Sequence, residues 1–316
     1  VNVMVFNNPY HSFFYDEKRS GIDIIHRGVL TASNGCVRLQ NTPEQWDLVP
    51  ETVSHKVDVD RQTVSVVVDY PDYGFQPEMR VSPRGKGFAV EVWLSQPVPK
   101  FLEGKAGFNL EFLPSAYWQR SFLIDGRPDY FPRYPGGNMV MRPTSEKVKQ
   151  VLGYTTYDDR GRGEFPVPRP FAQGHRLVLA PENADRCVKI ESDSTLLLFD
   201  GRQVAQNGWY VVRSLLPAGA TGKVLEWYVE PKVAEGWTRK PNIGFSQVGY
   251  EPSQNKQTII ELDKADTPLP TVTLLRIDAE GHSTAVAELP AKPWGRFRRY
   301  QYVTADFSSA REEGIY

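Results

Sequence analysis

The feature that most constrains this chain is a two-residue alternation of apolar and polar side chains, which recurs in short segments. In Phe88–Ser95, Phe, Val, Val and Leu occupy every second position. Neighbouring side chains of a strand point to opposite faces, so this pattern predicts a strand with one face in a core. Similar segments are Thr63–Tyr70, Gln76–Val81, Phe108–Phe112, Arg176–Leu179, Val188–Glu191, Thr195–Phe199, Tyr210–Leu216 and Val224–Val229.

Signals for helices are scarce. The best one is Thr42–Trp46, where Thr, Pro and Gln fit the first turn of a short helix. About fifteen strands without room for crossover helices favour an antiparallel sandwich over an α/β sheet. We therefore predict an all-β chain whose residues 1–236 form one large antiparallel sandwich. A two-sheet supersandwich, of the kind found beside helical barrels, is the specific hypothesis, by analogy.

Composition restricts the partners of the chain. Its 316 residues are 40% apolar and 12% aromatic, which is enough for two domains with cores. The 37 Lys and Arg residues nearly balance the 38 Asp and Glu residues, so neither nucleic acid nor a lipid surface is expected as a partner. No apolar run is long enough for a membrane span. Val1–Phe6 lacks the regions of a secretion signal, so we expect a mature or trimmed start.

Nucleophile and metal motifs do not appear. Cys36 and Cys187 have no metal-type spacing, and they form either one disulfide or two separate buried thiols. His26 and His55 fall in strand-like segments and are predicted to lie on polar faces. We expect no catalytic residue, no metal and no cofactor within these residues.

One interruption of the strand pattern, Asp125–Gly174, is rich in Pro, Gly, Arg and Tyr. We interpret it as a long loop, either a disordered excursion or a lid or contact surface. Its pair Asp158–Asp159 is expected to be a solvated charge pair. Tyr130, Phe131 and Tyr134 favour the contact surface, because purely solvated loops rarely carry so many aromatic residues.

Sugar rings stack on aromatic side chains, and neighbouring amides and guanidinium groups bind their hydroxyls. Ser115–Arg120 supplies all of these groups, in a predicted loop after the strand Phe108–Phe112. Its role is either glycan or domain contact, or ordinary packing. The candidate substrate-binding residues are Tyr117, Trp118, Arg120, Tyr130, Arg133 and Tyr134. Gln206–Tyr210 has a similar composition but continues directly into an apolar strand.

Residues 241–316 predict a second, smaller antiparallel sandwich, with strands at Lys256–Leu262, Thr271–Ile277 and Tyr300–Phe307. The basic aromatic segment Trp294–Tyr300 is predicted to be an edge strand protected by charge, or a face that docks on another domain. Two short motifs border this region. The first is Gln247-Val248-Gly249-Tyr250 with Pro252, and the second is Asp306-Phe307-Ser308 with Gly314 and Tyr316.

These motifs resemble the immunoglobulin-like domain that precedes the catalytic barrel of glycoside hydrolase family 9, the cellulase family. Ser246 stands where that family usually has Asn. The resemblance implies a Gln-Val-Gly-Tyr strand, a C-terminally incomplete small sandwich with an unpaired edge, and a catalytic barrel outside these residues. The base motif of that family, Asp-x-Gly-Asp, is not matched, and Asp263–Asp266 is expected to be a surface turn. Export, to a secreted or periplasmic location, is also implied.

Three functions remain open. The first is the non-catalytic N-terminal part of a family 9 enzyme acting on β-1,4-linked glucan, whose partners are β-glucan and the missing C-terminal catalytic domain. The second is a free-standing carbohydrate-binding or surface-interaction protein. The third is a catalytic sugar-modifying role for the large sandwich itself.

Overall fold

The computed structural model describes residues 1–8, 20–39, 50–137, 139–143, 156–157, 163–203, 208–298 and 300–316. The chain divides into two compact units, Val1–Ala234 and Glu235–Tyr316. In the described residues, helix is limited to the single turn α1 (Pro114–Tyr117) and the 3₁₀ turns η1 (Pro71–Tyr73), η2 (Lys100–Leu102) and η3 (Gly201–Gln203). The chain is all-β, as the alternation predicts. None of the helical turns in these ranges has the length or apolarity to cross a membrane.

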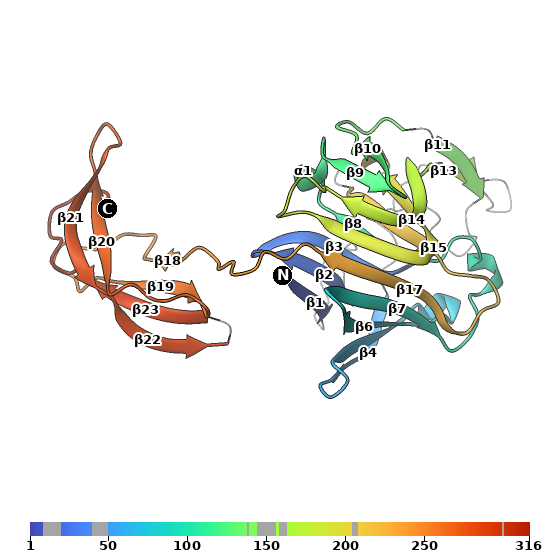
Figure 1. Cartoon of the computed structure of the whole chain (residues 1–316), viewed down its shortest axis with the longest axis horizontal. Coiled ribbons are helices and arrows are strands. Elements are labelled where there is room, and N and C mark those ends of the chain that lie inside the picture. Colours follow the sequence, from blue (N-terminus) through green and yellow to red (C-terminus); the bar gives the residue numbers. More distant parts are fainter. Residues whose placement is uncertain are drawn as a thin grey trace. The chain divides into compact units, whose positions relative to one another are not determined.

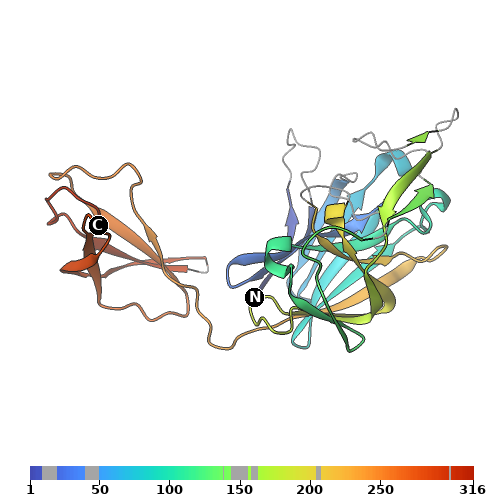
Figure 2. The same ribbon diagram turned by 90° about the horizontal axis from the view of Figure 1, so that it is seen from above.

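The first unit is organised by one antiparallel sheet of 14 strands that is nearly closed into a barrel (Figures 1 and 2). Its main path runs β1-β2-β3-β8-β16-β15-β17-β7-β6-β5-β4, and β14, β9 and β10 branch from β15. The two end strands of the path, β1 and β4, lie close together. His55 Nε2 of β4 lies 3.1 Å from the Val5 carbonyl oxygen of β1. The hydroxyls of Ser20 and Thr52 also share a hydrogen bond. The strands are β1 (Asn2–Asn7), β2 (Ser20–His26), β3 (Val29–Arg38), β4 (Glu51–Asp58), β5 (Thr63–Asp69), β6 (Pro77–Arg84), β7 (Gly87–Leu94), β8 (Gly107–Phe112), β9 (Ser121–Ile124), β10 (Arg127–Tyr130), β14 (Ala172–Leu179), β15 (Val188–Asp200), β16 (Tyr210–Leu215) and β17 (Gly222–Pro231).

The alternating side chains form the core of this sheet. The apolar face of β7 is buried along its whole length, which confirms the predicted strand face. Opposite Val90, the fully buried Trp227 packs edge-on against Phe108, with ring centroids 4.9 Å apart. Its indole N–H donates to the Ser214 hydroxyl at 3.0 Å, so burial leaves no polar atom of the ring unpaired.

The segments Val188–Glu191 and Thr195–Phe199, predicted as separate strands, are one continuous strand, β15. The first part of β15 pairs with β17 and the last part pairs with β16, while β14 follows both parts on the opposite edge. At the polar residues between the two segments the pairing with β14 shifts register: Leu196 pairs with Gly174 and Glu191 pairs with Arg176, so residues 192–195 of β15 bulge from the ladder. The sheet therefore splits beside residues 192–196, where β16 and β17 separate.

The prediction of a loop over Asp125–Gly174 is wrong for most of its described residues, because they lie in strands. Asp125 and Gly126, with φ of 48° and 81°, form a two-residue turn that joins β9 to β10. Asp-Gly is a strong hairpin signal because such turns need positive φ at both residues. Further along, β11 (Met139–Pro143), β13 (Gly163–Pro168) and β12 (Thr156–Tyr157) form a three-stranded sheet. The expected helix Thr42–Trp46 and the pair Asp158–Asp159 lie outside the described residues, as does part of Gln206–Tyr210.

The prediction for His26 is wrong, because its side chain is fully buried rather than on a polar face. Its Nδ1 lies 3.0 Å from the Thr31 hydroxyl oxygen, and its Nε2 has no hydrogen-bond partner. Burial is the main cause that lowers the pKa of His26 from 6.5 to about 4. Neither Cys36 nor Cys187 forms a disulfide, so the alternative of two separate thiols is confirmed; Cys36 is buried, and Cys187 is only half-buried.

The second unit contains a four-stranded sheet, β18-β19-β23-β22, and a two-stranded sheet, β20-β21. Its buried apolar centre is small and consists of Ile260, Leu262 and Val303. The edge position of β22 confirms the prediction for the basic aromatic segment. The strands are β18 (Asn242–Gly244), β19 (Gln257–Asp263), β20 (Thr271–Ile277), β21 (Ser283–Pro290), β22 (Lys292–Phe297) and β23 (Tyr300–Asp306).

The expected Gln-Val-Gly-Tyr strand is not formed. Residues 247–250 leave the sheet in a turn, and Val248 is 98% exposed. The strand that pairs with β19 comes earlier, at β18, because Gly249 has a positive φ of 85° that does not fit an extended ladder.

Candidate functional site

Two segments that the sequence analysis selected separately lie side by side in the first unit. The Gln119 amide donates to the Phe131 carbonyl at 3.2 Å, and the Phe131 amide donates to the Arg120 carbonyl at 2.9 Å. These bonds place the end of α1 beside the end of β10, and Figure 1 shows both elements at the same edge of the unit. The exposed side chains that result form an aromatic–arginine patch, defined as Trp118, Arg120, Tyr130, Arg133 and Tyr134.

Arg133 lies at the centre of this patch. Its guanidinium carbon is 5.0 Å from the centroid of the Trp118 ring and 5.2 Å from that of the Tyr134 ring. Contacts of this kind contribute about 0.5–1 kcal/mol at exposed sites. The rings remain accessible, because Trp118 is 37% exposed and Tyr134 is 71% exposed. The patch therefore offers aromatic surface and guanidinium donors together.

Tyr117, the sixth residue of the predicted set, does not belong to the patch. It is fully buried, and its ring packs edge-on against Phe112 at 5.3 Å. Its hydroxyl donates to the Arg186 carbonyl at 2.7 Å, and burial raises the pKa of Tyr117. For this residue the alternative of ordinary packing is the one observed.

Phe131 anchors the patch to the core. It is buried beside the exposed Tyr130, and its ring centroid lies 4.7 Å from that of Tyr210 and 5.3 Å from that of Phe122. Aromatic pairs in tilted and edge-on arrangements are stabilising beyond the area that they bury. These ring contacts thus fix the backbone of the Tyr130–Tyr134 segment against the core.

Arg202 fixes the same segment by hydrogen bonds. It donates to the carbonyl oxygens of Pro132 at 2.8 Å and Arg133 at 2.9 Å. Asp200 holds the guanidinium with two bonds of 2.8 Å, and this pairing raises the pKa of Arg202. The Tyr210 hydroxyl also donates to Pro132. The carbonyl partners of Arg202 lie 69 and 70 residues away along the chain, so no local sequence pattern indicates this role.

The β9–β10 hairpin has an anchor at its tip as well. The Asp125 carboxylate accepts the backbone amides of His175 and Arg176 at 2.9 Å each, and these bonds lower its pKa. A Cβ atom at Gly174 would lie 2.3 Å from Asp125 Oδ2. Glycine at this position therefore allows the carboxylate to reach the backbone of β14.

The patch contains no residue suited to proton transfer. Hydrolysis of a glycoside by two carboxyl groups requires one with a raised pKa. Among the carboxyls in the described ranges, burial raises the pKa of Asp23. Asp23 lies on β2, is 8% exposed, and accepts a hydrogen bond from Ser33 at 2.8 Å. None of the five patch residues carries a carboxyl group, and their aromatic and guanidinium groups are suited to binding.

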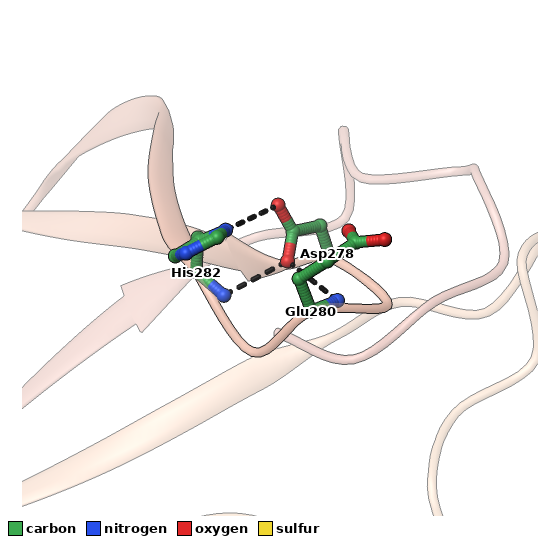
Figure 3. A group of neighbouring side chains, drawn as sticks. All are labelled: Asp278, Glu280 and His282. Atoms are coloured by element: carbon green, nitrogen blue, oxygen red, sulfur yellow. Dashed lines mark hydrogen bonds and ion pairs between the residues drawn. The ribbon is translucent and has the colours of Figure 1, made fainter.

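Asp278, Glu280 and His282 gather at the turn between β20 and β21 (Figure 3). His282 Nδ1 lies 3.3 Å from Asp278 Oδ2. Asp278 Oδ1 accepts the amides of Glu280 at 3.0 Å and His282 at 2.8 Å. All three side chains are exposed, and the bonds drawn in Figure 3 converge on Asp278. These bonds explain why the three side chains lie together: they close the turn, and they do not form a built metal site.

Comparison with models of protein families and with curated proteins returned no match to this chain. The fold is that of an all-β protein with a large, nearly closed antiparallel sheet and smaller sheets, and no family is identified.

Proposed function

We propose that these 316 residues are the non-catalytic N-terminal modules of a glycoside hydrolase similar to family 9, acting on β-1,4-glucan. In this proposal the first unit is a supersandwich and the second is an immunoglobulin-like domain. Both support a C-terminal catalytic barrel, and the aromatic–arginine patch shapes or extends its substrate cleft. Hydrolysis of an insoluble polymer outside the cytoplasm accounts for the proposed secreted or periplasmic location.

The single observation that carries the glycan part is the Trp118–Arg133–Tyr134 stack on an anchored hairpin. A sugar site made of aromatic faces and planar hydrogen-bond donors binds more tightly when these groups are already fixed, since ordering them during binding would reduce the affinity. Phe131, Arg202 and Asp125 supply that order in the free chain.

Contacts between the two family-like motifs support the proposal for the second unit. The rings of Tyr250 and Phe307, one from each motif, pack edge-on at 5.1 Å. The Ser308 hydroxyl accepts the Lys256 amide at 2.8 Å. The antiparallel bridge between Ile277 and Ile315 begins to cover the free edge of β20.

Binding is tested by electrophoresis of the 316-residue chain in gels that contain soluble β-glucan. We expect retardation of the wild type and a clear loss of retardation in Trp118→Ala and Tyr134→Ala. Trp294→Ala is the matched control, because Trp294 is also an exposed tryptophan but lies on β22 of the second unit. Equal retardation of Trp118→Ala and Trp294→Ala would contradict the role of the patch.

The alternative function, a free-standing carbohydrate-binding protein, is favoured by the contacts that Arg133 makes with Trp118 and Tyr134 within this chain. The intact mass of the source protein separates the two. A mass that matches 316 residues would remove the enzyme proposal, and a larger mass with a helical barrel would support it. In either case we expect the isolated chain to show no glycosidase turnover.

A further inference from the structure

A groove of the first unit lies along the middle of β15, where β16 and β17 separate from each other. This charged groove has a volume of about 840 Å³, within the roughly 300–1,000 Å³ typical of ligand sites. Its lining comes from the β6–β7 turn, β14, the middle of β15 and β17. The residues that matter here are Arg84, Arg176, Glu191, Asp193, Lys223 and Glu226.

Two register shifts in the strand pairing border this groove. One is a bulge of β15, whose residues 192–195 lie opposite His175 alone of β14, and the other is a bulge of β17, where Val224 is the extra residue between Lys223 and Leu225. A bulge adds one residue to a strand and re-aims the neighbouring side chains, and bulges are over-represented beside functional sites. Here each bulge adjoins a cation of the lining, Arg176 or Lys223.

The charged side chains of the groove are held by one another. Glu226 binds both Arg84 and Lys223, and Arg176 Nε lies 2.9 Å from Glu191 Oε1. Hydrogen bonding to Lys223 lowers the pKa of Glu226. A ligand therefore meets side chains whose rotamers are already fixed, which lowers the entropic cost of binding.

The backbone of the groove is fixed as well. The Ser192 hydroxyl donates to the Glu226 carbonyl at 2.7 Å and accepts the Ser194 amide at 3.1 Å. His175 Nδ1 lies 3.2 Å from the Ser192 carbonyl oxygen. These bonds hold the exposed carboxylate of Asp193 at the bend of β15.

The chemistry of the lining selects one class of ligand. Three cations, Arg84, Arg176 and Lys223, balance three carboxylates, Glu191, Asp193 and Glu226, so these six groups together carry no net charge. A polyanion would need an excess of cations. The cores of protein interfaces are depleted in Lys, Glu and Asp, so a protein partner fits poorly. Paired guanidinium and carboxylate groups match the vicinal hydroxyls of a sugar.

We propose that the charged groove binds a neutral oligosaccharide, at a site separate from the aromatic–arginine patch. The proposal rests on the proposed function only for the choice of probe, cellohexaose.

Isothermal titration of the whole chain with cellohexaose tests this proposal. We expect Asp193→Ala and Arg176→Ala, alone and combined, to raise the dissociation constant at least tenfold, while Glu280→Ala, an exposed carboxylate of the β20–β21 turn, changes nothing. Hydrogen exchange should show protection of residues 191–194 on binding, a readout that does not depend on the variants.

The outcomes separate the two sites. Binding that survives Trp118→Ala but is lost in the groove variants supports the groove and contradicts the patch. Binding that is lost in Trp118→Ala and unchanged in the groove variants overturns the groove and leaves the patch intact. No binding of cellohexaose, or no protection of residues 191–194, overturns the assignment of the groove.

Discussion

Replacing Arg202 by alanine tests the anchor of the aromatic–arginine patch. The side chains of Arg202 and Asp200 are 13% and 3% exposed, so solvent screens their two bonds of 2.8 Å only weakly. The substitution leaves the Asp200 carboxylate buried without a counter-charge. Breaking a buried pair in this way costs about 3–5 kcal/mol, whereas an exposed pair contributes about 0–1 kcal/mol. We therefore expect the free energy of unfolding of the first unit to fall by about 3–5 kcal/mol.

Urea unfolding followed by circular dichroism measures this change, with Arg276→Ala as the matched control, since Arg276 pairs with the exposed Glu312 in the second unit. The double variant Asp200→Asn/Arg202→Ala distinguishes the charge from the packing. Because the neutral amide removes the stranded charge, it should recover at least about 1 kcal/mol relative to Arg202→Ala. A loss below about 1 kcal/mol in Arg202→Ala, or no recovery in the double variant, would refute the reasoning.

Three further predictions follow from buried groups. The pKa of His26 is lowered from 6.5 to about 4, so the unfolded chain binds more protons in this window. Stability should therefore decrease as the pH falls from about 6.5 towards 4, by on the order of 3 kcal/mol, and His26→Phe should flatten the dependence of urea midpoints on pH. Phe131→Ala should cost about 3–5 kcal/mol of unfolding free energy, whereas the exposed Tyr130→Ala should stay within about 0.5 kcal/mol; similar losses would contradict the anchoring role of Phe131. Thiol titration of the unfolded chain without reductant should find both Cys36 and Cys187 reactive, and reductant should leave the urea midpoint unchanged; a single disulfide would give neither result.

Strand identity could be predicted from the sequence because it depends on neighbouring residues. The alternation in Phe88–Ser95 predicted β7 and its buried face, and Tyr210–Leu216 predicted β16. Signals were also present for features that were missed. Asp125-Gly126 predicts a hairpin between β9 and β10, but the Pro, Gly and Arg residues that follow favoured a loop. His26 was misassigned because alternation gives the two faces of a strand, not what covers each face.

The candidate site was predictable in composition and only partly in position. Trp118, Arg133 and Tyr134 have the chemistry of a sugar site wherever they lie. Their contact depends on backbone bonds between α1 and the end of β10, and Tyr117 was excluded because its position on α1 faces the core. Arg202 supports the site by hydrogen bonds to carbonyl oxygens of residues 69 and 70 positions away, and no local sequence pattern encodes such contacts.

By itself the sequence determined that the chain is all-β, where most strands run, and that aromatic and guanidinium groups are concentrated in two short segments. Only the tertiary structure decided that these segments meet, that β15 joins two predicted strands, and that the sheet splits there to form a charged groove. The physical reason is that side-chain periodicity is a property of consecutive residues. Strand order and bulges instead depend on which distant edges pair, and that choice depends on the packing of the whole sheet.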